Sequence, residues 1–296
     1  MFSIRDVERM SGIKAHTLRV WESRYGLALP QRKESKHRFY TNEDLQAILR
    51  IAWLYRQGYK ISYIASLSYN SIAEMIEKEV RSGVFFTEQM SEMLKASRHL
   101  DDDLFERTMA NTILQLGIER AMVHVFYPVL EKIGYRWMSG DFIPAQEHFA
   151  TNLIRNMLIR QLDDLAMPQP NGRLPILLFT PEEEYHELPL LFIHYLLRKN
   201  GYPTIYLGAN VSEQVIEDVC RSRPVVQLHY HQLTNFTNYD ADEYLEMWCD
   251  KFPQKQIVVS GPLTLQMPEL PPNAHAVRSM NELLLYCRQP YPYGRD

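Results

Sequence analysis

Three successive patterns of hydrophobic and polar residues run along this chain. Up to about residue 70, short segments with apolar residues at helical spacing are separated by glycines and by one polar, basic stretch. From 87 to 167 the spacing is helical almost throughout. From 175 onward, short apolar runs alternate with helical segments. The pattern therefore predicts a helical head, a helical middle region and an α/β region.

The head is predicted to be a small helical domain over residues 1–70. Ser3 stands at the N-cap position of a first helix, and Asp6 follows three residues later in the capping-box position. Gly26 ends a second helix, and Thr41 caps a third. The remaining elements are expected as helices over 14–25, 42–57 and 61–66, and as a two-stranded basic wing over 30–40.

Residues 71–86 are predicted to be a linker, and 87–167 a four-helix bundle. The breaks between the helical segments are only two or three residues long, which implies that neighbouring helices run antiparallel. A Pro/Gly/Asn-rich stretch over 168–174 reads as a second linker. The four helices are expected over 87–98, 101–115, 118–135 and 143–167.

The region 175–290 alternates strand and helix with short connections. Such alternation is typical of a doubly wound parallel sheet of Rossmann-like type, in which ligands bind beyond the carboxyl ends of the strands. Strands are predicted over 175–180, 204–207, 224–231 and 256–260, and helices over 186–200, 211–222, 240–251 and 279–287.

Composition and charge narrow the class of protein. Hydrophobic residues make up 46% and charged residues 23% of the chain, as in ordinary soluble domains. No run approaches the ~18 apolar residues of a membrane helix, and the N-terminus has no apolar signal core. Three cysteines lie far apart, which suits a reducing cytoplasm. We therefore expect a cytoplasmic protein with no membrane association.

Positive charge is concentrated in the head. Residues 1–70 carry 12 Lys and Arg against 6 Asp and Glu, and the rest of the chain carries 20 against 30. A basic head on an acidic body is typical of a nucleic-acid-binding module attached to another domain. Segregation of surface charge by chance is the alternative.

The head resembles the winged helix-turn-helix of the MerR family of transcription regulators. The resemblance rests on Arg19-Val-Trp-Glu-Ser-Arg-Tyr-Gly-Leu27, Pro30, His37-Arg-Phe-Tyr40 and Asp44-Leu45. The second helix would enter the major groove of promoter DNA, and the wing would grip phosphates. The predicted DNA-binding residues are Lys14, His16, Thr17, Arg19 and Arg24 on the helix, and Arg32, Lys36, His37, Arg38 and Tyr40 on the wing.

The rest of the chain resembles the cobalamin-binding, light-responsive (CarH-like) branch of the same family. Trp137 and the pair Glu147-His148 have the spacing of its helical cap, in which the Trp shields the upper corrin face. Glu184-Tyr-His186 resembles its acid-x-His signature, which implies that His186 ligates cobalt from below and that Glu184 bonds its other nitrogen. The implied cofactor is adenosylcobalamin or another corrinoid. The cofactor-binding residues expected in addition are Met138, Leu207, Gly208, His229, Ser260 and Gly261.

The sequence departs from that branch at positions that make room for the nucleotide tail of the cofactor. Pro189 replaces a Gly, His229 stands where the family has a small Ser or Thr, and Ser260-Gly261 replaces Gly-Gly. Met138 occupies the position at which light-responsive members carry a cobalt-ligating His, so light sensing of that kind loses its ligand. Gln227, His229 and His231 share one face of a strand, either as a polar or metal pocket or as hydrogen-bonded side chains.

These patterns predict a homodimeric or tetrameric transcription regulator that binds double-stranded promoter DNA and senses a corrinoid, with RNA polymerase or a regulatory protein as a further partner. One alternative keeps DNA binding but gives a degenerate sensor domain a protein partner or another ligand. A corrinoid-dependent methyltransferase or mutase subunit is a third interpretation, which the basic head opposes. The sequence contains no nucleophile triad, P-loop or paired catalytic carboxylates, so no enzymatic activity is expected.

Overall fold

The computed structural model describes residues 2–27, 31–32, 38–56, 58–81, 87–165, 173–234, 240–267 and 269–290. The chain forms two compact units, Met1–Ile154 and Arg155–Asp296. Helix α10 (Pro144–Asp163) belongs to both units. Each unit is described by itself.

The N-terminal head contains short helices and a small antiparallel sheet. Ser3 and Asp6 form the predicted capping box: the amide of Asp6 donates to Ser3 Oγ at 3.2 Å, and the amide of Ser3 donates to Asp6 Oδ2 at 2.7 Å. Gly26 ends α2 in the left-handed conformation. The elements are β1 (Phe2–Ser3), α1 (Ile4–Ser11), α2 (Ala15–Tyr25), β2 (Gln31–Arg32), β3 (Arg38–Tyr40), α3 (Asn42–Arg56) and α4 (Ile61–Ile64).

The wing is part of a sheet with the order β1-β3-β2 within the described residues. Its two strands β2 and β3 were predicted, whereas the pairing of the chain's first residues with β3 was not. One apolar cluster holds α1, α2, α3 and β3 together; it includes the buried side chains Val7, Leu18, Trp21, Tyr40, Leu45 and Ile48. The aromatic ring of Tyr55 meets Trp21 edge to face at 5.3 Å.

The prediction of a linker over 71–86 is wrong for most of its length. Helix α5 (Tyr69–Arg81) occupies it, and 82–86 lie outside the described residues. The polar sequence Ser68 to Ser71 starts this helix, because Ser68 Oγ accepts the amide of Ser71 at 3.1 Å as an N-cap does. Ile72 is buried in the core of the head, so the helix extends the head.

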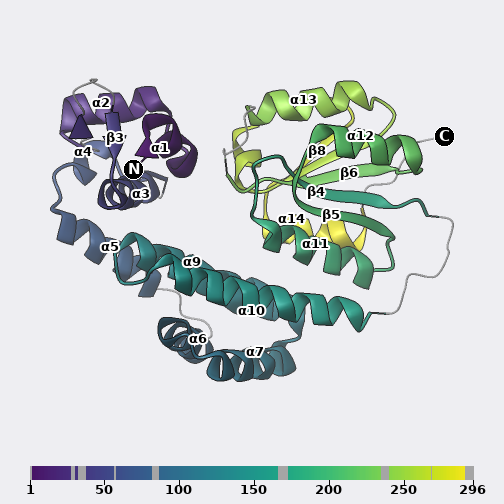
Figure 1. Cartoon of the computed structure of the whole chain (residues 1–296), viewed down its shortest axis with the longest axis horizontal. Coiled ribbons are helices and arrows are strands. Elements are labelled where there is room, and N and C mark those ends of the chain that lie inside the picture. Colours follow the sequence, from purple (N-terminus) through teal and green to yellow (C-terminus); the bar gives the residue numbers. More distant parts are fainter. Residues whose placement is uncertain are drawn as a thin grey trace. The chain divides into compact units, whose positions relative to one another are not determined.

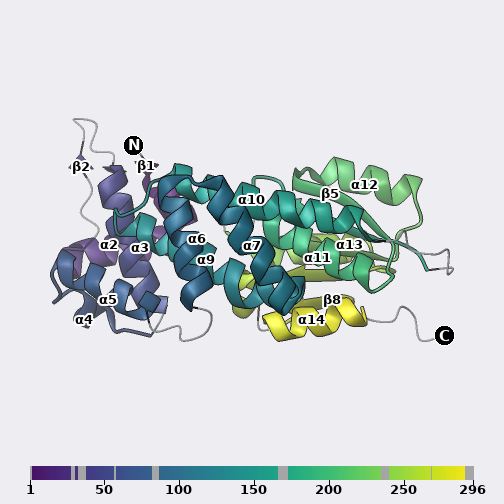
Figure 2. The ribbon, with the colours of Figure 1, turned by 90° about the horizontal axis from the view of Figure 1, so that it is seen from below.

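The predicted helical bundle is present. It comprises α6 (Thr87–His99), α7 (Asp102–Leu116), α8 (Ile118–Ala121), a π-helical turn (Met122–Phe126), α9 (Tyr127–Met138) and the first part of α10. The segment predicted as one helix over 118–135 is therefore continuous but widened by one π turn. Helices α6, α7 and α9 lie together in both views (Figures 1 and 2). Phe105 of α7 and Phe149 of α10 meet edge to face at 5.7 Å.

The second unit is a parallel α/β fold, as predicted. Its sheet has the order β5-β4-β6-β7-β8 among the described residues. The last strand was not predicted, because Ala-His-Ala-Val is only four residues long and is interrupted by a polar residue. The elements are β4 (Ile176–Pro181), α11 (Glu187–Lys199), β5 (Thr204–Val211), α12 (Glu213–Ser222), β6 (Gln227–His231), α13 (Ala241–Lys251), β7 (Gln256–Ser260), a 3₁₀ turn (Pro262–Gln266), β8 (Ala274–Val277) and α14 (Met280–Arg288).

Helices cover both faces of this sheet (Figure 1). Helices α12 and α13 lie on one face and α11 and α14 on the other. Side chains alternate along each strand, so Leu228 and Tyr230 pack in the apolar core with α13. The other residues of β6 point to the opposite face, which α11 and α14 cover; they are Gln227, His229 and His231. Of the helices in the described residues, none has the length and apolar character that crossing a membrane requires.

The packing of α13 on the sheet predicts that truncating Trp248 strongly destabilises the fold. Trp248 is fully buried, and its ring lies 6.1 Å from that of Phe179 and 5.8 Å from that of Phe252. We expect Trp248→Ala to lower the free energy of unfolding by about 3–5 kcal/mol, because it removes these contacts and leaves a cavity. Urea unfolding followed by circular dichroism measures this. Leu265→Ala, at a residue 71% exposed, is the control, and an equal effect of both changes would contradict the packing described.

Candidate functional site

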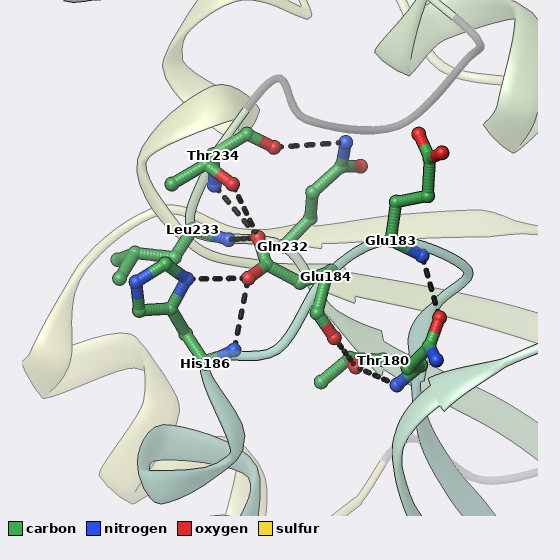
Figure 3. A network of polar contacts seen from close by, with 8 residues as sticks. Thr180, Glu183, Glu184, His186, Gln232, Leu233 and Thr234 are labelled. Carbon is green, nitrogen blue, oxygen red and sulfur yellow. Dashed lines mark hydrogen bonds and ion pairs between the residues drawn. The ribbon is translucent and has the colours of Figure 1, made fainter. Parts of the chain in front are cut away.

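A buried carboxylate lies at the carboxyl end of β4 (Figure 3). Glu184 has no exposed surface, and both of its oxygens are hydrogen-bonded. Oε1 accepts the backbone amide of His186 at 3.0 Å and lies 2.5 Å from His186 Nδ1. Oε2 accepts the amides of Leu233 and Thr234 at 3.0 and 2.8 Å and the Thr234 hydroxyl at 2.9 Å. One carboxylate thus ties the segment after β4 to the segment after β6.

These bonds keep Glu184 ionised. Burial by itself raises the pKa of this carboxyl, but the hydrogen bonds and charge of His186 and the amide of Thr234 outweigh it and hold the pKa at about 2. Because an ionised carboxylate only accepts hydrogen bonds, His186 Nδ1 carries a proton and donates it to Glu184. The tautomer of His186 is therefore assigned by its partner.

His186 presents its ring at the surface of the unit. It is the N-cap residue of α11, and its side chain is 46% exposed. Since Nδ1 donates to Glu184, Nε2 is the nitrogen that a metal would take. An imidazole whose other nitrogen is held by a carboxylate has the tautomer and the basicity of a metal ligand.

Two glycines lie at the same edge of the sheet. Gly261 follows β7 with a φ of 117°, and a Cβ there would lie 2.1 Å from the carbonyl oxygen of Gln232. No side chain fits at this close approach of the segments after β6 and β7. Gly208 in β5 has a φ of 82°, and a Cβ there would lie 3.1 Å from Glu187 Oε1. Leu207 precedes it and is partly buried.

A chain of polar side chains fills the sheet face under α14. His229 Nδ1 lies 3.1 Å from the Tyr286 hydroxyl, and His229 Nε2 lies 2.9 Å from Ser260 Oγ. Ser260 Oγ also lies 2.9 Å from His231 Nδ1, and the Tyr286 hydroxyl donates to Gln227 Oε1 at 3.2 Å. These five residues are buried. We call them the β6 polar chain.

The proton positions in the β6 polar chain are fixed by its last bond. The Tyr286 hydroxyl gives its proton to Gln227, so it accepts from His229 Nδ1. His229 Nε2 then accepts from the Ser260 hydroxyl, which in turn accepts from His231 Nδ1. Burial lowers the pKa of His229 to about 3 and that of His231 to about 4, so both rings are neutral, as this chain requires.

The hydrogen-bonded interpretation of Gln227, His229 and His231 is therefore confirmed. The metal interpretation is wrong for the part of the chain that the structure describes, where no three His, Cys, Asp or Glu side chains are grouped to hold an ion. The sequence indicated His229 and His231 but missed two partners. Tyr286 lies 55 residues beyond His231 in the last helix, and Thr234 lies in a polar segment with no recognisable motif.

Trp137 and Met138 end helix α9 in the first unit. Both side chains are partly buried against the apolar core of the head. Arg50 of α3 is fully buried beside them, and its Nε donates to the carbonyl oxygen of Met138. The Arg50 guanidinium also lies 4.2 Å from the ring centre of Tyr69. A cation at the C-terminus of a helix is stabilised by the helix dipole, so Arg50 joins the head to α9.

Glu147 and His148 lie on the first turns of α10. His148 Nδ1 is 3.0 Å from Glu147 Oε2, and the side chains are 74% and 41% exposed, respectively. The Thr151 hydroxyl donates to Glu147 Oε1 at 2.6 Å. The pair is thus open to solvent and oriented by its own helix. Its predicted place beside the upper corrin face stays a prediction.

The predicted DNA-binding side chains of α2 are accessible. Lys14, His16, Arg19 and Arg24 are exposed, and Thr17 is partly exposed. Arg38 Nε donates to Glu22 Oε2 of α2 at 2.9 Å, so this ion pair joins the wing to the helix. Lys36 and His37 lie outside the described residues, and only the backbone of Arg32 is described.

The prediction is wrong for Tyr40. Its side chain is 1% exposed and belongs to the core of the head, so it cannot reach a phosphate. Arg38, two residues earlier and therefore on the same face of β3, is held by Glu22 of α2, so this face packs on the helices of the head.

The buried carboxylate predicts how stability depends on pH. The pKa of Glu184 is near 2 in the folded chain and 4.5 in the reference state. The group therefore stabilises the fold by about 3 kcal/mol above pH 4.5, and this contribution is lost as the pH falls toward 2. We expect wild type to lose more stability between pH 7 and pH 3 than Glu184→Gln, in urea unfolding at each pH.

Glu246→Gln, at an exposed carboxylate of α13, is the control for that experiment. It should keep the pH dependence of wild type. An identical pH dependence in wild type and Glu184→Gln would contradict the assignment of an ionised, hydrogen-bonded Glu184.

Comparison with known proteins relates two segments of the chain to established families. Residues 2–70 match the MerR HTH family regulatory protein, and residues 90–160 match the B12 binding domain. About two thirds of the chain shares its fold with a monomethylamine corrinoid protein of Methanosarcina barkeri, with a TM-score of 0.53 at 12% identity over 67% of this chain and 95% of that one.

Two curated relatives span most of the chain. The HTH-type transcriptional repressor CarH of Myxococcus xanthus is 28% identical over 82% of this chain and 81% of its own length. The HTH-type transcriptional repressor CarA of the same organism is 32% identical over 73% of this chain and 71% of its own length. With a MerR-type head, a B12-binding type of helical domain and a parallel α/β fold in the same order, the chain belongs to the family of the CarA and CarH transcriptional repressors.

Proposed function

We propose that this protein is a homo-oligomeric regulator that binds promoter DNA through α2 and the wing, and that it senses a corrinoid at His186. The observation that supports the sensor role most strongly is the pair Glu184–His186. It joins a buried, ionised carboxylate to a half-exposed imidazole at the carboxyl ends of the strands, where ligands of open parallel sheets bind.

DNA binding is supported by the exposed face of α2. His16, Arg19 and Arg24 of this helix and its N-cap residue Lys14 are accessible. The wing is joined to the helix through Arg38 and Glu22. A helix of this type reads bases in the major groove, and wing cations contact phosphates. Oligomerisation is proposed because two-fold symmetric regulators match palindromic half-sites.

The lower side of a corrinoid fits the residues at His186. When bound, the corrinoid would supply a cobalt ion with a coordination position that an imidazole can take. His186 would bind it through Nε2, and Glu184 would hold the ring in the required tautomer. Gly208 and Gly261 accommodate neighbouring parts of the protein itself, the side chain of Glu187 and the backbone of Gln232, so the proposal does not depend on them. Trp137, Glu147 and His148 are proposed for the upper face.

The nucleotide tail of adenosylcobalamin fits this unit less well than the lower side of the corrin ring does. The β6 polar chain occupies the interior where the family resemblance places small residues for the tail. This filled interior favours a second candidate function, in which the protein keeps its DNA-binding role and a regulatory protein occupies its sensor domain. Either function is non-enzymatic, in keeping with relatives that are named as repressors.

The DNA-binding role predicts a change in salt dependence. Arg19 is exposed on α2, and Arg19→Ala should weaken binding to promoter DNA and reduce the slope of log K against log salt concentration by about one, since one fewer counterion is released. Fluorescence anisotropy at several salt concentrations measures the slope. Arg221→Ala, at an exposed cation of the α/β unit, is the control, and equal slopes for both variants would contradict the assignment of α2.

The sensor role predicts imidazole coordination of cobalt. Wild type incubated with cobinamide, methylcobalamin or adenosylcobalamin should give an absorption spectrum with a nitrogen-ligated cobalt for at least one of them. His186→Ala should abolish that spectrum, and Glu184→Gln should weaken binding about 10–100-fold, because the ligand loses its orienting partner. A spectrum that is unchanged in His186→Ala would refute the assignment.

A further inference from the structure

The interior beneath His186 determines which corrinoids can bind. Rows of side chains on β6 and β7 point toward α11 and α14, the face on which the β6 polar chain lies. In β6, Gln227 and His229 are fully buried, and His231 is 7% exposed. Ser260 of β7 pairs with His231 in the strand register, and both lie at the carboxyl ends of their strands. The polar chain thus begins at the edge of the sheet where His186 lies and runs inward.

Helix α14 covers the β6 polar chain. Tyr286 of this helix is 3% exposed, and its ring meets the His229 ring edge to face at 5.0 Å. Its hydroxyl bridges His229 and Gln227. The imidazole and phenol rings therefore occupy the layer between β6 and α14, where a ligand group inserted beside β6 would have to lie.

Displacing this chain is costly because its hydrogen bonds depend on one another. One direction of donation runs from His231 Nδ1 through Ser260 and His229 to Tyr286 and Gln227, and each of these residues is buried. His231 Nε2 and Gln227 Nε2, at the two ends of the chain, are buried without a hydrogen-bond partner. A ligand that separates Tyr286 from His229 leaves buried donors and acceptors unpaired, at about 1–3 kcal/mol for each group. Directional hydrogen bonds therefore hold the five side chains of the β6 polar chain in place, so they rearrange less easily than loosely packed apolar side chains would.

We propose that the His186 site takes a corrinoid without a nucleotide tail, of the cobinamide class, and that His229 and Tyr286 exclude tail-bearing cobalamins. This inference rests on the proposed corrinoid-sensing function. In a cobalamin the base of the tail can occupy the lower side of the cobalt, so His186 binds there only after that base has left. The displaced tail needs a place in the protein, and the β6 polar chain fills the interior that would receive it. In cobinamide the same position holds an exchangeable water.

The test compares two ligands on one protein. Full-length wild type is titrated with cobinamide and with cobalamin in matched upper-ligand forms, and binding is followed by absorbance and by calorimetry. We expect cobinamide to bind at least ten times more tightly than cobalamin. We expect His229→Ser to raise the affinity for cobalamin toward that for cobinamide, because it shortens the side chain and breaks the bond to Tyr286.

Two variants serve as controls. Tyr230→Phe changes a buried residue of the same strand that points to the opposite face, so it should keep the wild-type preference. His186→Ala should lose cobinamide binding, which separates coordination from adsorption. Thermal unfolding by circular dichroism establishes that each variant folds. If His229→Ser does not fold, the wild-type comparison still decides the preference.

The outcomes separate the inference from the function on which it rests. Cobalamin binding as tight as cobinamide binding to wild type would overturn the exclusion of the tail and leave corrinoid sensing intact. Failure of both ligands to bind wild type and His229→Ser would overturn corrinoid sensing, and the inference with it. It would also favour the function with a protein partner.

Discussion

The ionised carboxylate of Glu184 is the constraint on which the ligand edge of the α/β unit depends. A buried charge is costly unless hydrogen bonds compensate it, and here the compensation comes from two separate segments. The amide and ring of His186 bind one oxygen, and residues 233 and 234 bind the other. The need to satisfy one group therefore sets the position of the imidazole, the path of the chain after β6 and, through the contact of Gln232 with Gly261, the start of the segment after β7. The tautomer and orientation that His186 needs as the proposed cobalt ligand are a consequence of this local requirement.

The same sheet carries a second polar arrangement with the opposite electrostatic character. Around Glu184, burial is offset by donors and the charge is kept. In the β6 polar chain, burial lowers the pKa of both histidines and the rings stay neutral, so that His229 can donate through one nitrogen and accept through the other. An apolar side chain at position 229 would also fill the layer under α14. The polar chain differs from an apolar filling in that it fixes the mutual positions of β6, β7 and α14 through directional bonds. Such a layer resists partial opening by a ligand.

Sequence patterns predicted the parts of this protein that depend on local interactions. The capping box of Ser3, the end of α2 at Gly26 and the alternation of strands and helices after residue 175 all follow from neighbouring residues. The failures have a common origin in long-range packing. Helix α5 was read as a linker because its apolar residues make sense only against the head, and β8 was missed because it is short and completes a sheet edge. Tyr40 was taken as a DNA contact because it belongs to the basic wing segment, whereas its ring packs into the core of the head. The pair Glu184–His186 was predicted from its motif, but the partners Thr234 and Tyr286 are distant in sequence and carry no signal of their own.

Trp137 lies where helix α9 packs against the head. Trp137 is half-buried against the core of the head, and Arg50 binds the carbonyl at the end of the same helix. The family resemblance assigns Trp137 to the upper face of a bound corrin. If a corrin binds there, as we propose, it would contact an indole that also packs against the head, so corrin binding and the position of the head would influence each other. Such a coupling is reciprocal: whatever free energy the ligand gains from one arrangement of the head, DNA binding in that arrangement gains from the ligand. Within the first unit, Trp137 is thus the residue at which the proposed ligand sensing and DNA binding would share a contact.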